Sequence, residues 1–441
     1  MTKINILAIN SGSSSLKYKL FLFDKSKDEI NLVSKGSITE ITSPISSQFT
    51  AKIISSNTKI SKSLNIQTHE KAFSHILSYL LDTIINSKEQ IKYIVHRIVH
   101  GITESQPIIL KSDSSPSKEL SKLDSLSELA PLHNHSSVLI LKSCLKELSN
   151  SINYAFFDTL FHQSIKPHIY TYALPYDEAK QKRIRKYGFH GLSYSYVSKV
   201  AAKHMGIDLN DDNSKFICLH LGSGASMCAI RGGKSVDTTM GLTPLEGLPG
   251  GTRSGLIDPC AIFHFSSKAR KGDESHHPVD KQFHLTEAES ILNHNSGFKG
   301  LCGTSDFSEI VKQSQDTTNG SENSNSSINK ERAKLTFDIF INRIVNYIGS
   351  YFVTLEGNVS ALIFTGGIGE NNKELREAVA EKIKCLGFKS VDKEKNKSVE
   401  ELFKSGKDVV DISSGSTENF RLLVIETDEE KEMVNQLISK I

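Results

Sequence analysis

Charged and imidazole side chains recur inside short stretches that otherwise have the pattern of a buried strand or a tight turn. Arg97 lies in HRIVHG, Asp158 in FFDTLFH, His190 in YGFHG and Arg253 in PLEGLPGGTRSG. Burying such groups without partners is costly, so we expect them to contact one another or a charged ligand. LAPLHNH contains a fifth candidate, His133, for which a hydrogen-bonded core histidine is the alternative interpretation.

Three turns made of small residues indicate that this ligand carries phosphate. They are INSGSSSLK at 9–17, HLGSGAS at 220–226 and FTGGIGENN at 364–372, and each is associated with an apolar strand pattern. Glycine and serine let successive backbone N–H groups approach an anion, and Lys17 adds a compact positive charge. Considered alone, each of these segments could equally be a simple turn that binds no phosphate.

Two common phosphate motifs do not fit the sequence. RGGKS resembles the end of a Walker A loop, but that loop needs a glycine five residues before Gly233, where Cys228 stands. GGIGENN lacks the last glycine of the dinucleotide fingerprint. The sequence therefore supports neither a P-loop NTPase nor a Rossmann dinucleotide-binding protein.

Apolar strands and amphipathic helices surround the three turns. INILAIN and KYKLFLF flank the first turn, and KFICLHL and SMCAI flank the second, which suggests an internal duplication of one sheet-based unit. A helix is predicted over 331–356, followed by the strand SALIFT, the third turn and a helix over KELREAVAEKIK. Alternating strands and helices predict an α/β fold.

Length, charge and cysteine usage narrow the class of protein further. With 441 residues, of which 38% are hydrophobic, the chain can form two domains or one large α/β unit, and its net charge of +3 does not suggest nucleic acid. The six cysteines are scattered without a CxxC pair, which favours free thiols in a reducing compartment. Neither a secretory leader nor a membrane-length apolar run is visible, so we expect a cytoplasmic protein with no membrane partner.

Two polar segments have the composition of surface loops. The tract at 312–330, KQSQDTTNGSENSNSSINK, predicts an insertion with almost nothing to bury. A second segment contains Ser275, His276 and His277, but a metal site there would need a partner carboxylate or cysteine, and none is suggested by the spacing.

Taken in order, the motifs closely resemble those of the acetate kinase family. INSGSSSLK, HRIVHG, LAPLHN, FDTLFH, YGFHGLSY, HLGSGAS, GLTPLEGLPGGTRSG, FTGGIGEN and TDEE carry the resemblance, which spans Asn5 to Glu430. It implies a relative of sugar kinases, Hsp70 chaperones and actin, with two duplicated ribonuclease-H-like domains and a nucleotide cleft between them. The first domain would be residues 1–152 joined by a C-terminal helix at 428–441, and the second 153–427 with the insertion at 312–330. The resemblance also implies a homodimer.

The family reaction is a reversible, direct in-line transfer of the γ-phosphoryl group of ATP to acetate, giving acetyl phosphate and ADP. By resemblance, Arg97 and Arg253 would hold the carboxylate and the equatorial phosphoryl oxygens. His190 would stabilise the phosphoryl group in transit, and His133 would support the same region. An acetate ion needs no general base, so we expect Asp158 to orient Arg97 or magnesium rather than to abstract a proton.

The resemblance also implies residues that contact the nucleotide, the acyl group and the metal. The nucleotide-contacting residues would be Ser13, Ser15, Lys17, His220, Leu221, Gly222, Ser223, Gly224, Asp306, Phe307, Ser308, Gly367, Ile368, Gly369, Glu370 and Asn371. The acyl pocket would contain Val99, Leu132, Phe189 and Pro244, which suits acetate, with propionate close behind. Mg²⁺, or Mn²⁺ in its place, would bind at Asn10 and Glu429. The alternative for Glu429 is a purely structural position in the first turn of a helix capped by Thr427 and Glu430.

Three positions depart from the family pattern. Ile102 stands where the family usually repeats glycine, Leu256 where an aspartate usually follows glycine, and Ser308 where an arginine is usual. These departures put nucleotide affinity and specificity in question. Three alternatives therefore remain: a kinase for propionate or butyrate, an actin- or Hsp70-like ATPase without a small acceptor, and a relative that binds nucleotide without turnover.

Overall fold

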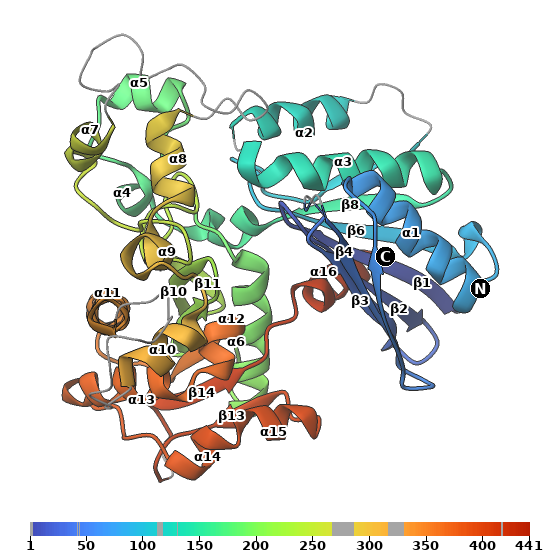
Figure 1. Ribbon diagram of the computed structural model, residues 1–441. Coiled ribbons are helices and arrows are strands. Elements are labelled where there is room, and N and C mark those ends of the chain that lie inside the picture. Colours follow the sequence, from blue (N-terminus) through green and yellow to red (C-terminus); the bar gives the residue numbers. More distant parts are fainter. Residues whose placement is uncertain are drawn as a thin grey trace, which may run out of the picture. The chain divides into compact units, whose positions relative to one another are not determined.

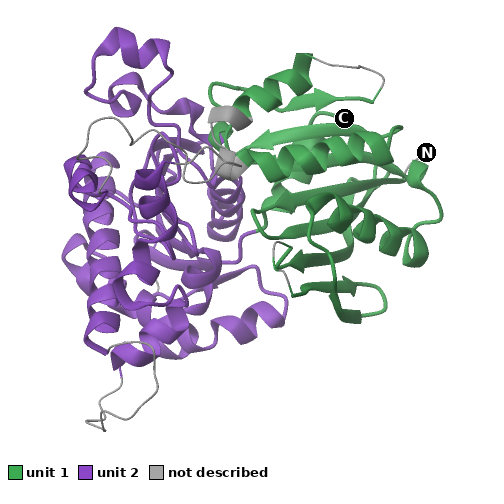
Figure 2. Ribbon diagram, turned by 45° about the horizontal axis from the view of Figure 1, so that its top comes forward, with its two compact units in different colours: residues 1–160, 428–441 green, residues 161–427 purple. Residues whose placement is uncertain are grey.

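The computed structural model describes residues 3–41, 43, 45–112, 118–129, 131–266, 286–315, 330–415 and 418–441 (Figure 1). The side chains at 127–133 lie outside this description, as do Ser275, His276, His277 and most of the predicted insertion at 312–330. The chain forms two compact units: residues 1–160 with 428–441 form unit 1, and residues 161–427 form unit 2 (Figure 2).

Unit 1 is built around one mixed sheet whose strands follow the order β5-β4-β3-β2-β1-β6-β8-β7. Strands β1 to β5 are antiparallel neighbours, whereas β6 runs parallel to β1 and β8 parallel to β6. The strands are β1 (Lys3–Ser11), β2 (Leu16–Asp24), β3 (Glu29–Thr39), β4 (Ser47–Ile53), β5 (Thr58–Leu64), β6 (Ile91–Ile98), β7 (Ile108–Leu110) and β8 (Ile152–Phe157). The helices are α1 (His69–Thr83), η1 (Lys88–Gln90), α2 (Lys118–Leu129), α3 (Pro131–Glu147) and α16 (Glu429–Ile438), and η2 (Asp158–Ser164) leads into unit 2.

Helices cover both faces of the central strands of unit 1. Leu7, Leu16 and Leu20 belong to a buried apolar cluster that also contains residues of α1 and α3, while α16 packs against β1 and β6. Four consecutive residues in the middle of β1 are therefore buried, whereas burial alternates in the first half of β2, from Leu16 to Leu20. The edge strand β5 is almost entirely exposed.

Unit 2 is built around a second mixed sheet in the order β11-β10-β9-β12-β14-β13. The strands are β9 (Lys215–Leu221), β10 (Ala225–Arg231), β11 (Lys234–Thr238), β12 (Ala361–Thr365), β13 (Val409–Asp411) and β14 (Arg421–Ile425). The helices are α4 (Pro167–Tyr170), α5 (Tyr176–Gln181), α6 (Gly191–Met205), η3 (Pro259–Ala261), α7 (Ile262–Phe265), α8 (Glu287–His294), α9 (Gly297–Cys302), α10 (Phe307–Gln315), α11 (Lys330–Thr354), α12 (Gly366–Asn371), α13 (Lys373–Lys382), η5 (Lys384–Leu386), α14 (Lys393–Lys397) and α15 (Val399–Lys404).

The two faces of the unit 2 sheet are both buried. Leu219 and Phe364 belong to a cluster that includes α10, α11 and α13, whereas Cys218 and Ile363 belong to a cluster that includes α6. Alternate residues of one strand point to opposite faces, so strands covered on both sides are apolar throughout. This explains why FICL in β9 and ALIF in β12 are unbroken apolar runs.

The predicted duplication is confirmed at the level of strand order. In unit 1, β3-β2-β1 are antiparallel, β6 and β8 continue in parallel, and β7 ends the sheet antiparallel to β8. In unit 2, β11-β10-β9, then β12 and β14, then β13 repeat these directions. Unit 1 adds β4 and β5. The predicted domain boundary at residues 152–153 falls at the start of β8, which pairs within the unit 1 sheet.

Three local predictions differ from the structure. The PLHNH part of LAPLHNH, residues 131–135, is helical instead of strand or turn, because Pro131 opens α3, a position where its missing N–H costs nothing. GGIGEN forms α12 instead of a simple turn. The N-cap of the last helix is Asp428, whose side chain accepts a hydrogen bond from the N–H of Lys431, so the predicted cap at Thr427 is wrong.

Ile102 occupies a backbone position that explains why the family pattern has glycine there. Its φ is +53°, in the left-handed region, and its side chain is buried. A β-branched residue pays about 1–2 kcal/mol for this conformation, whereas glycine adopts it freely. This departure therefore adds backbone strain but leaves the turn conformation in place.

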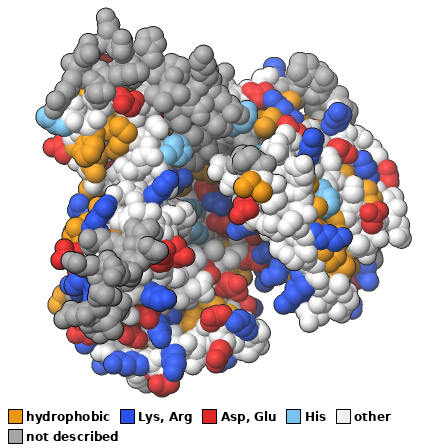
Figure 3. Space-filling model, viewed as in Figure 1, with side chains coloured by type: hydrophobic (Ala, Val, Ile, Leu, Met, Phe, Trp, Pro, Cys, Tyr) orange, Lys and Arg blue, Asp and Glu red, His pale blue; other side chains and the backbone are white. Residues whose placement is uncertain are grey.

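None of the helices in the described part of the chain has both the length and the apolar character that crossing a membrane requires. On the face shown in Figure 3, acidic and basic side chains are interspersed, in keeping with the nearly balanced charge of the chain.

Candidate active site

Arg97 and Asp158 form a bidentate ion pair in unit 1. The Nε of Arg97 donates to Oδ1 of Asp158 at 3.0 Å, and Nη2 donates to Oδ2 at 2.7 Å. Arg97 is on β6 and Asp158 directly follows the parallel strand β8, so both side chains lie at the carboxyl ends of neighbouring strands. The Asp158 side chain is only 1% exposed. Because both N–H groups along the guanidinium edge that faces Asp158 are bound, the carboxylate fixes the orientation of Arg97.

Glu429 and Asn10 complete this group. The Nη1 of Arg97 donates to Oε2 of Glu429 at 3.0 Å, and the Nδ2 of Asn10 donates to the same oxygen at 3.1 Å. Asn10 on β1 lies directly opposite Arg97 in the parallel pairing of β1 and β6. We call Asn10, Arg97, Asp158 and Glu429 the Arg97 cluster.

The pKa values of Arg97 and Glu429 are both shifted upward, for different reasons. Burial opposes the charge on Arg97, but Asp158 and Glu429 outweigh it and raise the pKa of the guanidinium above its ordinary value. Burial raises the pKa of Glu429 to about 7; the charges of Asp158 and Glu430 add to this effect, and Arg97 and Lys17 oppose it. Glu429 therefore holds a proton more readily than an ordinary carboxylate.

A second layer of charges supports Asn10. Its Nδ2 also donates to Oε1 of Glu430 at 2.9 Å, and Lys19 forms ion pairs with Glu430 at 3.3 Å and with Asp428 at 2.7 Å. Burial opposes the charge on Glu430, but Lys19 and Asn10 outweigh it and the pKa of this carboxyl is lowered. Glu430 is therefore held ionised beside Asn10, in contrast to Glu429.

The first small-residue turn joins β1 to β2 as predicted. The N–H of Gly12 donates to the carbonyl of Ser15 at 2.8 Å, Ser13 is exposed, and Lys17 lies opposite Asn10 in the hairpin. Nε2 of His69 on α1 lies 2.9 Å from the carbonyl oxygen of Gly12. This contact was not predicted, because nothing in the sequence near His69 marks it as a partner of the turn.

In unit 2, Arg253 and His190 converge on the second small-residue turn. A Cβ atom added at Gly224 would lie 3.1 Å from Nη1 of Arg253 and 3.7 Å from Nε2 of His190. Within the described residues the guanidinium of Arg253 has no carboxylate partner, and burial alone lowers its pKa. A partly buried cation beside an open glycine backbone is a ready receptor for an anion. We call Gly224, His190 and Arg253 the Gly224 cluster.

The position of His190 is fixed by several contacts. Its φ is +56°, Nδ1 lies 2.8 Å from Oγ of Ser226, and its ring stacks on His220 with centroids 4.1 Å apart. Ser226 also hydrogen-bonds Tyr194 at 2.5 Å. His220 Nδ1 in turn lies 2.8 Å from Oγ of Ser193. Ser226 is part of HLGSGAS, so its place in the motif was visible although its contact with His190 was not.

The second and third turns meet in unit 2. A Cβ added at Gly222 would lie 4.0 Å from the backbone nitrogen of Gly367, and one added at Gly366 would lie 2.7 Å from the carbonyl oxygen of Leu221. Gly366 has a φ of +77°, so only glycine satisfies both the conformation and the close approach. The predicted nucleotide-contacting residues at 220–224 and 367–371 are thus brought together.

Glu370 has a structural function in this arrangement. Its Oε1 accepts from the backbone N–H of Gly366 at 2.8 Å and of Thr427 at 3.0 Å, while burial raises its pKa. Arg376, fully buried on α13, donates from Nη1 to the carbonyls of Gly369 and Glu370 at 2.9 and 2.8 Å. These bonds hold α12, which carries Gly367 to Asn371.

Three further predicted nucleotide residues begin α10. Oδ1 of Asp306 accepts from the N–H of Ser308 at 2.9 Å, and Ser308 is exposed. Phe307 is buried in the core of unit 2, with its ring 5.3 Å from that of Phe340. The ring of Phe307 is therefore part of the core of unit 2.

The predicted acyl-pocket residues are divided between the units. Val99 and Leu132 belong to unit 1, and Phe189 and Pro244, both buried, to unit 2. The side chains of Leu132 and His133 lie outside the described residues, so their predicted functions stay predictions. His162 of FFDTLFH, for which the sequence predicts no function, lies with Nε2 2.9 Å from the carbonyl oxygen of Phe189 and thereby supports this residue.

The predicted metal ligands provide oxygen atoms of the kind that Mg²⁺ prefers. Asn10 and Glu429 present an amide and a carboxylate oxygen within one hydrogen-bonded cluster. No group of three or more His, Cys, Asp or Glu side chains is arranged to hold a metal ion within the described ranges. Mg²⁺ usually takes one or two protein carboxylates and keeps several waters or phosphate oxygens, so the oxygens of Asn10 and Glu429 fit such an ion.

Comparison with known proteins identifies the family. The sequence pattern of the acetokinase family matches residues 5–435. A probable acetate kinase of Neurospora crassa is 40% identical over 98% of this chain and 93% of its own length, and an acetate kinase of Phytoplasma mali is 38% identical over 98% and 99%. Among solved structures, the acetate kinase of Porphyromonas gingivalis has a TM-score of 0.78 at 31% identity and covers 99% of both chains. A propionate kinase of Francisella tularensis has a TM-score of 0.77 at 32% identity over 98% of both.

The fold and these matches define a phosphotransferase that uses ATP or ADP and has a carboxyl group as acceptor. The chain belongs to the acetokinase family. The predicted family, the α/β fold class and the class of enzyme are thereby confirmed.

Proposed function

We propose that this chain catalyses the reversible transfer of the γ-phosphoryl group of ATP to acetate, giving acetyl phosphate and ADP. The observation that carries the proposal is the Gly224 cluster, in which the guanidinium of Arg253 and the imidazole of His190 face the backbone of one glycine. With no carboxylate beside it in the described part of the chain, Arg253 is left to neutralise an external anion. The oxygens of a phosphoryl group in transit are such an anion.

The chemistry requires no general base. A carboxylate oxygen of acetate attacks the γ-phosphorus, the bond from that phosphorus to the β,γ-bridging oxygen breaks, and ADP leaves with the electron pair. The difficulty is the repulsion between an anionic nucleophile and an anionic phosphate. Arginines that stabilise phosphoryl transfer contribute factors of about 10³ to 10⁵ in rate. These factors correspond to roughly 4–7 kcal/mol of transition-state stabilisation.

Each cluster is assigned the reactant that suits its charge. Arg253 and His190 bind oxygens of the transferred phosphoryl group. Arg97, which Asp158 and Glu429 hold from two sides and which also donates to Oδ1 of Asn10, retains one N–H group, on Nη2, for the acetate carboxylate. Asp158 is a positioning residue, because both of its carboxylate oxygens already accept from Arg97.

Asn10 and Glu429 would hold Mg²⁺. The ion, when bound, neutralises phosphate charge and orients the β- and γ-phosphates. Its binding requires the ionised form of Glu429, whose pKa is raised to about 7, so metal and proton compete for this carboxylate. Contacts of the three small-residue turns with the nucleotide, a homodimeric state and a cytoplasmic location are proposals that rest on the family resemblance.

A direct test traps the acyl phosphate with hydroxylamine while ATP is supplied together with acetate, propionate or butyrate in parallel. The proposal predicts hydroxamate formation with the highest kcat/KM for acetate, because one extra methylene changes pocket affinity by only about 1–3 kcal/mol and propionate should follow. A preference for butyrate, or ATP hydrolysis that is indifferent to acetate, would contradict it.

Propionate is the second candidate acceptor. The observation in its favour is the similarity to the propionate kinase of Francisella tularensis, which is as high as that to solved acetate kinases. The ratio of kcat/KM for acetate and propionate in the trapping assay decides between the two.

A further inference from the structure

One face of the unit 1 sheet carries a row of four lysines. Lys19 on β2 lies opposite Lys35 on β3, Lys35 lies opposite Lys52 on β4, and Lys52 lies opposite Lys59 on β5. We call these residues the lysine row. Neighbouring strands are about 4.8 Å apart, so four positions in line span roughly 14 Å. Like charges directly opposite each other destabilise a sheet, so an arrangement of this kind needs a reason.

A row of hydroxyl groups runs beside the lysine row on the same face. Each of its positions is two residues away from a lysine of the row on the same strand: Lys17 lies opposite Ser37, Ser37 opposite Thr50, and Thr50 opposite Ser61. We call Ser37, Thr50 and Ser61 the hydroxyl row. Oγ of Ser37 is 3.0 Å from Oγ1 of Thr50. Hydroxyl groups at this spacing can each donate a hydrogen bond to an anionic oxygen.

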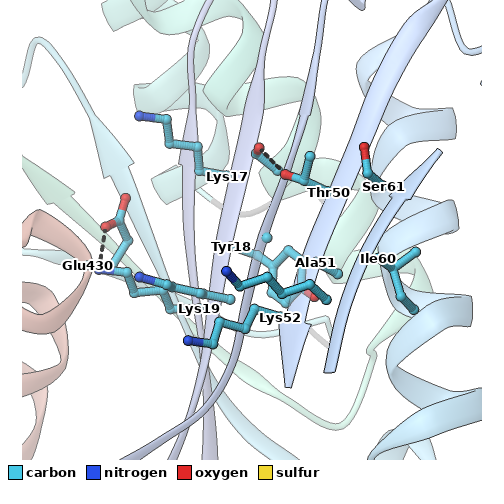
Figure 4. A pocket seen from close by; sticks show the side chains of 13 residues that line it. Lys17, Tyr18, Lys19, Thr50, Ala51, Lys52, Ile60, Ser61 and Glu430 are labelled. Atoms are coloured by element: carbon cyan, nitrogen blue, oxygen red, sulfur yellow. Dashed lines mark hydrogen bonds and ion pairs between the residues drawn. The ribbon is translucent and has the colours of Figure 1, made fainter. Parts of the chain in front are cut away.

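All eight residues line a concave cavity of about 490 Å³. Figure 4 shows Lys19 and Lys52 on this surface, with the hydroxyl-bearing side chains of Thr50 and Ser61 beside them and Glu430 of α16 at one side. The volume is in the range of small-molecule sites, about 300–1,000 Å³. The cavity lies entirely within unit 1.

The charges in this cavity are not balanced by the protein. Lys19 is paired with Asp428 and Glu430, but Lys35, Lys52 and Lys59 form no ion pair with any described residue. Glu430 is the only acidic residue among those that line the cavity. The plain alternative is that lysines protect an exposed sheet edge from pairing with other chains. That explanation suits Lys59 on the edge strand β5, but not Lys35 and Lys52, which lie on interior strands.

We propose that the lysine row and the adjacent hydroxyl row bind a small oligophosphate anion. Lysine ammonium groups act as point charges that suit phosphate, whereas planar recognition of carboxylates favours arginine, which is not present among the lining residues. A single-stranded nucleic acid would require aromatic platforms, and the one aromatic residue of the cavity, Tyr18, is buried. Several adjacent phosphates of one chain can pair with several lysines at once, which a single phosphate cannot do.

The test measures binding of tripolyphosphate by isothermal titration calorimetry. Every protein used in the titrations carries Arg253→Gln. This substitution weakens anion binding at the Gly224 cluster, so that binding at the lysine row can be measured separately. The triple variant K35Q/K52Q/K59Q removes three charges of the row but leaves Lys19, which is paired with Glu430. The matched control is Lys62→Gln on the same strand as Lys59, because Lys62 lies opposite Phe49 and outside the cavity.

The proposal predicts that tripolyphosphate binds the Arg253→Gln protein, that added salt weakens the binding, and that the triple variant weakens it by about tenfold or more. Lys62→Gln should stay within about twofold, since surface charges outside the site contribute little. Inorganic phosphate should bind more weakly than tripolyphosphate. Equal binding by the triple variant and the control, or no binding by the Arg253→Gln protein, would overturn the proposal.

The triple variant also tests whether the row strains the sheet. Removing like charges from neighbouring strands should leave the melting temperature unchanged or raise it, so weaker binding cannot be attributed to unfolding. In the otherwise unsubstituted protein, the triple variant should leave acetyl phosphate formation within about twofold, because Lys35, Lys52 and Lys59 are not among the residues assigned to the nucleotide, the acetate or the metal. These two readouts separate the oligophosphate site from the proposed phosphoryl transfer.

Discussion

Arg97 donates two parallel hydrogen bonds to Asp158, at 3.0 and 2.7 Å, across the carboxyl ends of two neighbouring parallel strands. Asp158→Asn keeps the shape of the side chain but removes its charge. We expect kcat/KM for acetate to fall by about 10²-fold, because small misplacements of a binding group have effects of this size. A steady-state assay of acetyl phosphate formation measures the change.

The control for this variant is Asp124→Asn, which breaks an exposed ion pair with Lys142 in the same unit. It should leave kcat/KM unchanged. Since Asp158 is assigned no proton transfer, the pH–rate profile should lose no ionisation, but the one that reports Glu429 should move to lower pH because the charge of Asp158 raises the pKa of Glu429. An Asp158→Asn enzyme with full activity would show that Arg97 needs no orientation by this carboxylate.

Glu429 should make the stability of the protein depend on pH. Its pKa is raised from 4.5 to about 7 in the folded state, mainly by burial. As the pH rises, Glu429 therefore loses its proton in the unfolded chain before it does so in the folded protein. The stabilisation contributed by protonated Glu429 is fully present below about pH 4.5 and is lost as the pH rises through 7. Relative to Glu429→Gln, the protein should lose about 3 kcal/mol of unfolding free energy over this range.

Urea titrations at several pH values measure the difference, with the exposed Glu119→Gln as control. A constant difference between the protein and Glu429→Gln would contradict the assignment.

Magnesium should compete with the proton on Glu429. Added Mg²⁺ binds the ionised carboxylate, so it should raise the melting temperature more at pH 8 than at about pH 6. The effect should disappear in Glu429→Gln and persist in Glu119→Gln. A shift that is independent of pH, or one that survives in Glu429→Gln, would place the metal elsewhere.

Gly224→Ala tests the anion receptor of unit 2. The new methyl group would lie 3.1 Å from Arg253 Nη1, so it occupies the space assigned to phosphoryl oxygens. We expect turnover to fall by about 10²-fold with little change in stability. Gly349→Ala is the control, because nothing lies within 4 Å of a Cβ atom there. Gly349 is inside α11, toward its C-terminal end, so alanine should stabilise the helix by about 0.5–1 kcal/mol. Circular dichroism melts and steady-state kinetics distinguish the two effects. Equal turnover for the two variants would contradict the receptor.

The sequence predicted those features that depend on local pattern. Strands around the first two turns, the helix over 331–356 and the α/β class all follow from apolar periodicity and turn residues. The sequence also predicted that Arg97 and Asp158 would have charged partners, because burying either charge without one is costly. The helical start at Pro131 was missed although proline at a first helical position was a visible signal.

Other features require the strand register and could not be derived from the sequence. Lys19, Lys35, Lys52 and Lys59 follow no regular spacing along the chain and form a row only when four strands pair. The bond of Asn10 with Glu430 joins residues 420 positions apart. Such contacts depend on the whole fold, and no local pattern of residues predicts them.

The central claim is that the Arg253 guanidinium stabilises the phosphoryl group in transit. Arg253→Ala should lower kcat for acetyl phosphate formation by about 10³- to 10⁵-fold. Arg231→Ala, in the same unit and bound to Glu356 and Asp212 at the surface, should change it by less than about twofold. Circular dichroism melts should show both variants folded. An Arg253→Ala enzyme that forms acetyl phosphate at a rate close to that of Arg231→Ala would contradict the account.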